Sequence, residues 1–276
     1  MSSKVTFWDG KEHIVYVVEI AFYSVLFIAS VAALLRRRQL VKGTILCTIS
    51  ALKISGSAVS VHAAIQTVNA INSPDTSKFP STSLVTVGAI LTSLATAPLL
   101  VLTRAFCPED SLHKKLQRFS RILVIVPAIL AIVGYNYWAD GGSSMDTGIA
   151  LVKASSILYV ALYLLFVASG LKKYLQIRDS ATRLEATGIF IVLTAMPFFI
   201  VRFVFVIASS FSLTTNMNAH HKFSYFDGDW RISLSMFVVM EFVVEIVYCF
   251  GVHLLISREA QQSFASSDEA TEKESA

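Results

Sequence analysis

Two glutamates, Glu241 and Glu245, stand near the middle of the long apolar run 232–256. Residues four positions apart share one face of an α-helix, so both carboxyl groups and Tyr248 are expected on a single polar stripe. An ionised carboxylate in hydrocarbon costs on the order of a few kcal/mol, so the stripe must face protein, water or a trapped proton. A buried acid that keeps its proton near neutral pH can act as a general acid, which makes these two residues the catalytic candidates.

Four more charged residues fall inside apolar runs: Glu19, Lys53, Lys153 and Arg202. We expect Arg202 to pair with Glu241, because both fall in the same half of their runs and a guanidinium can grip a carboxylate through two hydrogen bonds. Glu245, nearer mid-depth, is then the residue expected to hold a proton. Lys153 is close enough to the end of its run for its stem to reach the interface. The alternative is that all six charges pair and fix helix register without any chemistry.

Charged residues inside apolar runs are unusual because the chain as a whole is strongly hydrophobic. Of the 276 residues, 54% are hydrophobic and 15% are charged, and the mean hydropathy is +0.63. These values exclude a soluble domain and predict an integral membrane protein with the lipid bilayer as its main partner. The net charge is +4, but the basic residues lie in short loops, where they indicate membrane topology. We therefore expect no nucleic acid partner. The sequence leaves room for an apolar small-molecule ligand and says nothing about oligomeric state.

Seven windows approach the roughly 20 residues that cross about 30 Å of hydrocarbon. The sequence therefore predicts an all-α bundle of seven transmembrane helices, at residues 14–35, 41–66, 83–102, 119–138, 148–171, 186–209 and 232–256. The remaining segment, 257–276, is rich in serine, alanine and acids and lacks an apolar face. We expect it to be a disordered cytosolic tail.

Loop charges predict the orientation of this bundle. Lysine and arginine are retained on the cytoplasmic side of membranes. One alternating set of connections, together with the tail, holds 15 of the 23 basic residues, and the other set holds five. The amino terminus is therefore expected outside or in a lumen, and the carboxyl terminus in the cytosol. The polar residues inside the runs are biased toward the outer side, which favours a cavity open to that side.

Motif absences limit the chemistry further. The three cysteines, Cys47, Cys107 and Cys249, have no CxxC spacing, and there is no HExxH or aspartate-rich motif. No metal site and no cofactor are therefore predicted. Nothing resembles a glycine-rich nucleotide loop.

A short set of motifs carries a family resemblance. Pro197, Arg202, Ser209 and Ser210 in the sixth window, with Met240 and Glu241 in the seventh, resemble a family of fungal multi-pass membrane proteins of unknown function. The likeness covers most of the chain and implies seven helices and a pairing of Arg202 with Glu241. A weaker, architectural likeness links the chain to seven-helix proteins encoded in fungal terpenoid and indole-diterpene clusters, some of which are cyclases that use buried acids.

Two classes of function follow. The first is a membrane protein of fungal secondary, terpenoid-type metabolism: an acid-initiated isoprenoid cyclase, or an accessory factor, that uses Glu241 or Glu245 in an outward-facing cavity. The second is a carrier, an exporter or a receptor-like protein in which the same charges are structural or act as gates. Whether the chain is an enzyme stays open. The endoplasmic reticulum is the favoured location, with the plasma or vacuolar membrane as alternatives.

Overall fold

Helices form nearly all of the residues that the computed structural model describes. The structure describes residues 6–36, 39–72, 82–107, 114–140, 142–177, 183–213, 222–223 and 229–275. Its longer helices are α1 (Lys11–Leu35), α2 (Leu40–Ile71), α3 (Thr82–Leu94), α4 (Thr96–Phe106), α5 (Lys114–Asp140), α6 (Met145–Ile177), α7 (Arg183–Ser212) and α9 (Met240–Ser275). The four-residue helix α8 (Trp230–Ser233) and a π-helical turn, Leu234–Val239, lead into α9. No strand occurs among the described residues.

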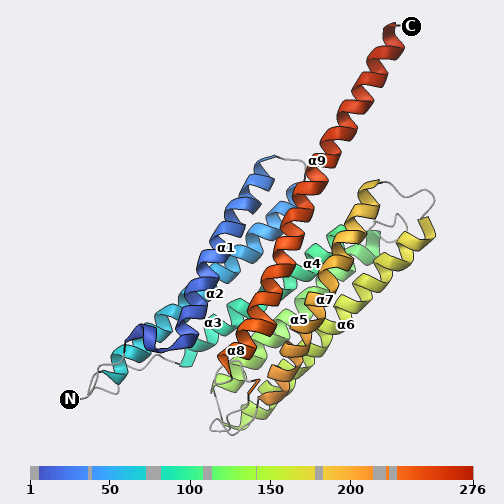
Figure 1. Ribbon diagram of the computed structural model, residues 1–276. Helices are drawn as coiled ribbons and strands as arrows, with labels where there is room; N and C mark the ends of the chain where they lie inside the picture. The colour runs from blue at the N-terminus through green and yellow to red at the C-terminus, as the bar shows by residue number, and fades with distance from the viewer. Residues whose placement is uncertain are drawn as a thin grey trace.

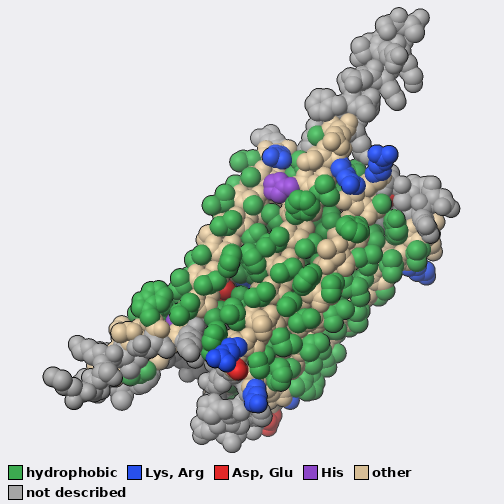
Figure 2. All heavy atoms as spheres, in the orientation of Figure 1, with side chains coloured by type: hydrophobic (Ala, Val, Ile, Leu, Met, Phe, Trp, Pro, Cys, Tyr) green, Lys and Arg blue, Asp and Glu red, His purple; other side chains and the backbone are tan. Residues whose placement is uncertain are grey.

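Within the described ranges, six helices are long and apolar enough to cross a membrane. They correspond to six of the seven predicted windows, and they make the chain a multi-pass membrane protein with the bilayer as its environment. Figure 2 shows hydrophobic side chains over most of the middle of one face, with lysine and arginine gathered toward the two ends. This distribution is the one expected when the middle of the bundle contacts lipid.

The predicted helix 83–102 differs from the structure. It is divided into α3 and α4, which meet at Ala95, and neither part alone reaches the length of a span. Pro98 explains the position of the break. Its nitrogen carries no hydrogen, so it cannot donate to the carbonyl of Leu94, which is the last residue of α3. As the third residue of α4, the proline lies in the first turn, where helices tolerate it.

The carboxyl-terminal segment also differs from the prediction. We expected disorder from Ser257 onward, but α9 continues to Ser275 in one piece. The segment contains alanine, glutamate, glutamine and lysine, which favour helix, and neither glycine nor proline interrupts it. In Figure 1 this part of α9 projects beyond the end of the bundle that lies opposite the start of α1.

The packing of neighbouring helices brings the charged residues to the centre. α1 packs along α2, α5 along α6, and α7 along α9 (Figure 1). Small residues allow some of these close approaches: a Cβ atom on Gly148 of α6 would lie 2.6 Å from the backbone nitrogen of Trp138 on α5. The largest fully buried side chains include Arg202 and Lys53. The interior of this bundle is therefore organised around ions as well as around apolar side chains.

Candidate functional site

Glu241 lies at the centre of a buried ionic cluster. One carboxylate oxygen, Oε1, accepts a hydrogen bond of 2.8 Å from Nη2 of Arg202 on α7. The other oxygen, Oε2, forms an ion pair with Nζ of Lys53 on α2. All three side chains have an exposed fraction of 0%. One carboxylate from α9 therefore ties together three helices that are far apart in the sequence.

Arg202 donates a second hydrogen bond through the nitrogen that bonds to Glu241. The same Nη2 atom donates to Oγ1 of Thr96 at 2.8 Å, and Thr96 is the first residue of α4 after the helix break. Phe237, in the π-helical turn, lies between the two cations: its ring centroid is 5.1 Å from Cζ of Arg202 and 4.8 Å from Nζ of Lys53. An aromatic face stabilises a cation through its quadrupole. The break and the π-helical turn thus place Thr96 and Phe237 against the cluster.

Glu245, one turn after Glu241 on α9, contrasts with it. Its side chain is 1% exposed, and neither carboxyl oxygen has a hydrogen-bond partner in the described part of the chain. Lys53 and Arg202 act on it electrostatically, as do the acids Glu241 and Glu19. Buried carboxyl groups without partners are uncommon, because ionised oxygens lose their hydration. Glu245 is therefore the member of the cluster with the most unusual environment.

Glu19 forms the edge of the cluster on α1. Its side chain is buried, and its Oε2 accepts a hydrogen bond of 2.7 Å from the hydroxyl of Ser57 on α2. Lys53 is the principal cation that acts on it. The cluster as a whole contains two cations, Lys53 and Arg202, and three acids, Glu19, Glu241 and Glu245.

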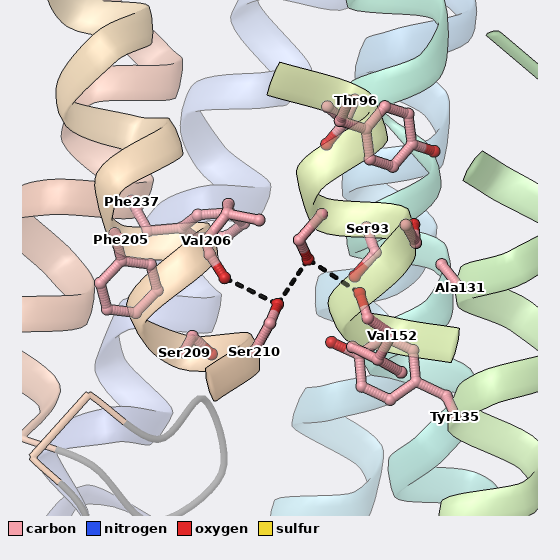
Figure 3. A pocket seen from close by; sticks show the side chains of 13 residues that line it. Ser93, Thr96, Ala131, Tyr135, Val152, Phe205, Val206, Ser209, Ser210 and Phe237 are labelled. Carbon is pink, nitrogen blue, oxygen red and sulfur yellow. Dashed lines mark hydrogen bonds between the residues drawn. The ribbon is translucent and has the colours of Figure 1, made fainter. Parts of the chain in front are cut away.

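A small pocket lies on the other side of Thr96. Its cavity volume is about 40 Å³, and its walls come from α3 to α7 together with the π-helical turn (Figure 3). Eight of the thirteen lining residues carry a hydroxyl group, and none of the thirteen is charged. Thr96 and Phe237 belong both to the wall of this pocket and to the surroundings of Arg202. The pocket and the ionic cluster therefore share a wall.

Hydrogen bonds hold the serines of this pocket in place. The hydroxyl oxygens of Ser156 on α6 and Ser210 on α7 lie 2.5 Å apart, and each can instead donate to a carbonyl oxygen of its own helix, so two protons serve three contacts (Figure 3). The hydroxyl of Ser155 donates to the carbonyl oxygen of Pro127 on α5 at 2.7 Å. The hydroxyl of Tyr159 is buried and has no partner among the described residues. The hydroxyls of Ser155, Ser156 and Ser210 are therefore hydrogen-bonded to protein oxygens, whereas that of Tyr159 is buried without a bond among the described residues.

Two of the site residues predicted from sequence lie outside the cluster. Lys153 stacks over the ring of Phe211, with Nζ 5.3 Å from the ring centroid, and is only partly buried. Tyr248 is buried, and its hydroxyl lies 2.8 Å from Oγ1 of Thr103 on α4. The structure brings together the other five predicted residues: Glu19, Lys53, Arg202, Glu241 and Glu245.

Sequence reasoning missed Thr96 and Phe237, as well as the bond between Lys53 and Glu241. A signal for Thr96 was available, because Pro98 marks the helix break that presents it to Arg202. Phe237 had none, since the sequence does not mark the π-helical turn. Among the described residues, no group of three histidine, cysteine, aspartate or glutamate side chains is arranged to hold a metal ion.

Comparison with known proteins gives a family and no activity. Residues 10–257 match a family described as a domain of unknown function (DUF7702). The match covers the whole described bundle and far more than half of the chain, so the protein belongs to this family. No curated protein and no solved structure matches the chain.

Proposed function

We propose that the protein is a carrier in which the buried charges gate a solute path and Glu245 carries a proton. The observation that supports this proposal is the unequal charge of the cluster. Two cations face three acids, and an ionised third acid would leave a net negative charge inside the membrane, which is costly. The cluster is neutral when one of the three carboxyl groups is protonated.

Glu245 is the acid that best fits the neutral form. Glu241 bonds to both cations, and Glu19 accepts a hydrogen bond from Ser57. These contacts stabilise a carboxylate, whereas Glu245 has no such contact among the described residues. When Glu245 loses this proton it becomes a second carboxylate beside the two cations. The new charge would attract Lys53 or Arg202 away from Glu241. Protonation and the packing of α2, α7 and α9 are therefore coupled.

The helix irregularities around the cluster favour a carrier. The break at Ala95, the π-helical turn and Pro197 all lie close in sequence to residues that contact the cluster or belong to it: Thr96, Phe237 and Arg202. Discontinuous helices beside a mid-membrane site are typical of secondary transporters, where they line the substrate path. The irregular turns give α4 and α9 places at which to bend during a gating movement.

The isoprenoid cyclase predicted from the two glutamates is less well supported. The described pocket has a cavity volume of about 40 Å³, and most of its lining residues carry hydroxyl groups. Neither Glu241 nor Glu245 lines this pocket, so it does not place a substrate against the two acids. A role in fungal terpenoid metabolism therefore rests on the resemblance described above, and the catalytic roles of Glu241 and Glu245 stay predictions.

We further propose that α3 and α4 cross the membrane together and complete seven spans. Their 13 and 11 residues reach roughly 36 Å at about 1.5 Å per residue, which exceeds the hydrocarbon thickness of about 30 Å. The excess of basic residues on one set of connections supports an outer or lumenal amino terminus. The endoplasmic reticulum stays the favoured membrane, with the plasma and vacuolar membranes as alternatives.

Infrared spectroscopy of the purified protein tests the proton on Glu245. The carbonyl stretch of a protonated carboxylic acid is separate from the stretches of a carboxylate, and its frequency shifts in deuterated water. We expect this band in the wild-type protein near neutral pH and its loss in Glu245→Gln, with Asp146→Asn, which changes an exposed carboxyl group outside the cluster, as the control. An unchanged band in Glu245→Gln would show that the residue holds no proton.

Gene deletion with metabolite profiling of cells and medium tests the carrier. Loss of a carrier changes how a compound is distributed between cells and medium, but the chemical structure of the compound stays the same. Glu245→Gln should fail to restore the distribution although the variant reaches the membrane in folded form. Loss of a product together with accumulation of its uncyclised precursor would overturn the carrier in favour of an enzyme.

A further inference from the structure

The hydroxyl-lined pocket beside the ionic cluster has the size and the walls of a water site. Its cavity volume is about 40 Å³, and a buried water needs roughly 10 to 15 Å³ of such volume, so about three molecules fit. Eight of the thirteen lining residues carry a hydroxyl group (Figure 3). Cavities that stay dry have apolar walls, whereas a bound water needs about two to four polar partners. The room and the polarity of this pocket therefore both favour water.

The lining residues are spread along the helices. On α6 they run from Val152 to Tyr159, which is about 10 Å at a rise of about 1.5 Å per residue. Three waters joined by hydrogen bonds of about 2.8 Å span roughly 6 Å between the outermost oxygens. The pocket is therefore long enough to hold them as a short chain along the bundle.

Hydroxyl groups held by the protein give these waters places to bind. A hydroxyl group has one proton and two lone pairs. Ser155 uses its proton in the bond to the carbonyl oxygen of Pro127, and Ser156 and Ser210 divide two protons among three contacts. The lone pairs that these bonds do not use can accept hydrogen bonds. Water, which both donates and accepts, can bond to these oxygens and to its neighbours in the chain.

One end of the pocket reaches the ionic cluster at Thr96. This residue lines the pocket, and its Oγ1 accepts a hydrogen bond of 2.8 Å from Nη2 of Arg202. The same Nη2 atom donates to Oε1 of Glu241 at 2.8 Å. A water bonded to the Thr96 hydroxyl is therefore connected to Glu241 through one threonine and one guanidinium group.

An apolar layer, formed by Ile90, Trp138, Ile149 and Leu213, lies beyond the other end of the pocket. Each of the four is three positions, about one helical turn, from a residue that lines the pocket. The corresponding lining residues are Ser93, Tyr135, Val152 and Ser210. All four steps lead toward the end of the bundle where α3 and α6 begin and α5 and α7 end. The four residues belong to one hydrophobic cluster or pack against it, so they separate the pocket from that end.

We propose that this pocket binds a short chain of about three waters, and that the apolar layer is a gate that controls their exchange with solvent. A closed apolar layer hinders water because its side chains offer no hydrogen bonds. In the topology proposed above, this gate faces the outer or lumenal side. The waters then form the outer part of a path that brings protons to the ionic cluster. That role rests on the carrier proposed above, whereas hydration and gating need only the pocket and the apolar layer.

Hydroxyl-radical labelling of the protein in lipid nanodiscs tests the hydration of the pocket. A short X-ray pulse produces radicals from water, including bound water, and the radicals hydroxylate the nearest side chains. Phe205 and Phe199 lie on the same helix and are 1% and 0% exposed, but Phe205 lines the pocket and Phe199 does not. We expect Phe205 to be labelled about fivefold faster than Phe199, or more. Equal rates would show a dry pocket and overturn the proposal.

Two variants of the apolar layer, Ile149→Ala and Leu213→Ala, test the gate. The matched control is Ile157→Ala, which makes the same change on α6 at a side chain that is 50% exposed and outside the pocket lining. After rapid mixing with water labelled with oxygen-18, the oxygen found on Phe205 reports how fast the pocket water exchanges. We expect about tenfold faster exchange in the two gate variants than in the wild type and the control. Unchanged exchange in both gate variants, measured on monodisperse protein, would overturn the gate.

Filling the pocket tests whether its waters deliver protons. Ala131 lines the pocket, so Ala131→Leu should displace water and reduce the labelling of Phe205 to the level of Phe199. In deuterated water, the infrared band of Glu245 should then shift about tenfold more slowly than in the wild type, because the proton has lost its outer path. An unchanged rate of this shift, together with the reduced labelling, would overturn the role of the waters in proton delivery.

The same measurements separate this proposal from the carrier. Faster labelling of Phe205 than of Phe199 in wild-type protein that lacks the Glu245 band rejects the proton site and supports the water site. The band together with equal labelling of the two phenylalanines rejects the water site and leaves the proton site standing.

Discussion

Glu241 and Glu245 lie one turn apart on α9, yet only Glu241 bonds to the buried cations. Its two oxygens contact Lys53 and Arg202, whereas both oxygens of Glu245 are without a partner in the described structure. Two chemically identical groups on one helix face therefore have different tasks. Glu241 bonds to side chains of two other helices, and Glu245 is the residue to which we assign the exchangeable proton.

This difference predicts unequal effects on stability. Glu241→Gln removes the carboxylate to which Arg202 and Lys53 bond, and the loss of one partner from a buried ion pair costs roughly 3 to 5 kcal/mol. Glu245→Gln breaks no described hydrogen bond and keeps the size of the side chain, so we expect a change within about 1 kcal/mol. Thermal unfolding of both variants in the same detergent measures the difference. Equal midpoints would contradict the assignment.

A double variant checks that charge is the cause. Arg202→Gln combined with Glu241→Gln removes both members of one pair, so neither charge of that pair is left buried without the other. We expect the double variant to recover much of the stability that Glu241→Gln loses. Additive losses would show that packing, and not charge, dominates at this position.

A second prediction compares Arg202 with Lys153, two basic residues that both lie inside apolar runs of the sequence. Arg202 is fully buried and bonds to Glu241 and Thr96, whereas Lys153 is partly exposed and stacks over Phe211. Arg202→Ala strands a carboxylate in the interior and should cost roughly 3 to 5 kcal/mol, whereas Lys153→Ala should cost about 1 kcal/mol or less. The yield of folded, monodisperse protein provides the measurement. Similar yields for the two variants would argue against a structural role for Arg202.

The residues that form the cluster were predictable because charges are rare in apolar runs. Glu19, Lys53, Arg202, Glu241 and Glu245 are conspicuous for that reason alone, and their burial follows from the cost of exposing an ion to lipid. Lys153 shows the limit of this reasoning. Its position in a run did not show that the side chain would stack over Phe211 outside the cluster.

The details that shape the site depend on local backbone geometry. Pro98 shows that the window 83–102 cannot be one regular helix, but hydropathy alone predicts it as continuous. The π-helical turn at Leu234–Val239 has no sequence signal that we recognise, yet it places Phe237 between two cations. Periodic patterns predict regular helices, so they miss the irregular turns where this site is built.

A third prediction concerns topology. A tag at Met1 should be lumenal or extracellular and a tag at Ala276 cytosolic, because basic residues gather on alternate connections. Protease protection in sealed vesicles locates both tags. A glycosylation site inserted within residues 73–81 should be modified and one within 108–113 should not, if α3 and α4 cross the membrane together. Modification of both insertions, or both ends on one side, would exclude seven spans.

The last prediction concerns the packing of α5 against α6. A Cβ atom on Gly148 would lie 2.6 Å from the nitrogen of Trp138 and 2.7 Å from the carbonyl oxygen of Gly134, and backbone atoms cannot move aside as a flexible side chain can. Alanine at a helix position normally gains about 1 kcal/mol over glycine, but overpacking costs about 1 to 3 kcal/mol. The overlap here is with two backbone atoms of α5, so we expect Gly148→Ala to lower the thermal midpoint. Ala154→Leu adds more volume on the exposed face of the same helix and should leave the midpoint unchanged. A midpoint raised by Gly148→Ala would mean that the helices are further apart than the structure places them.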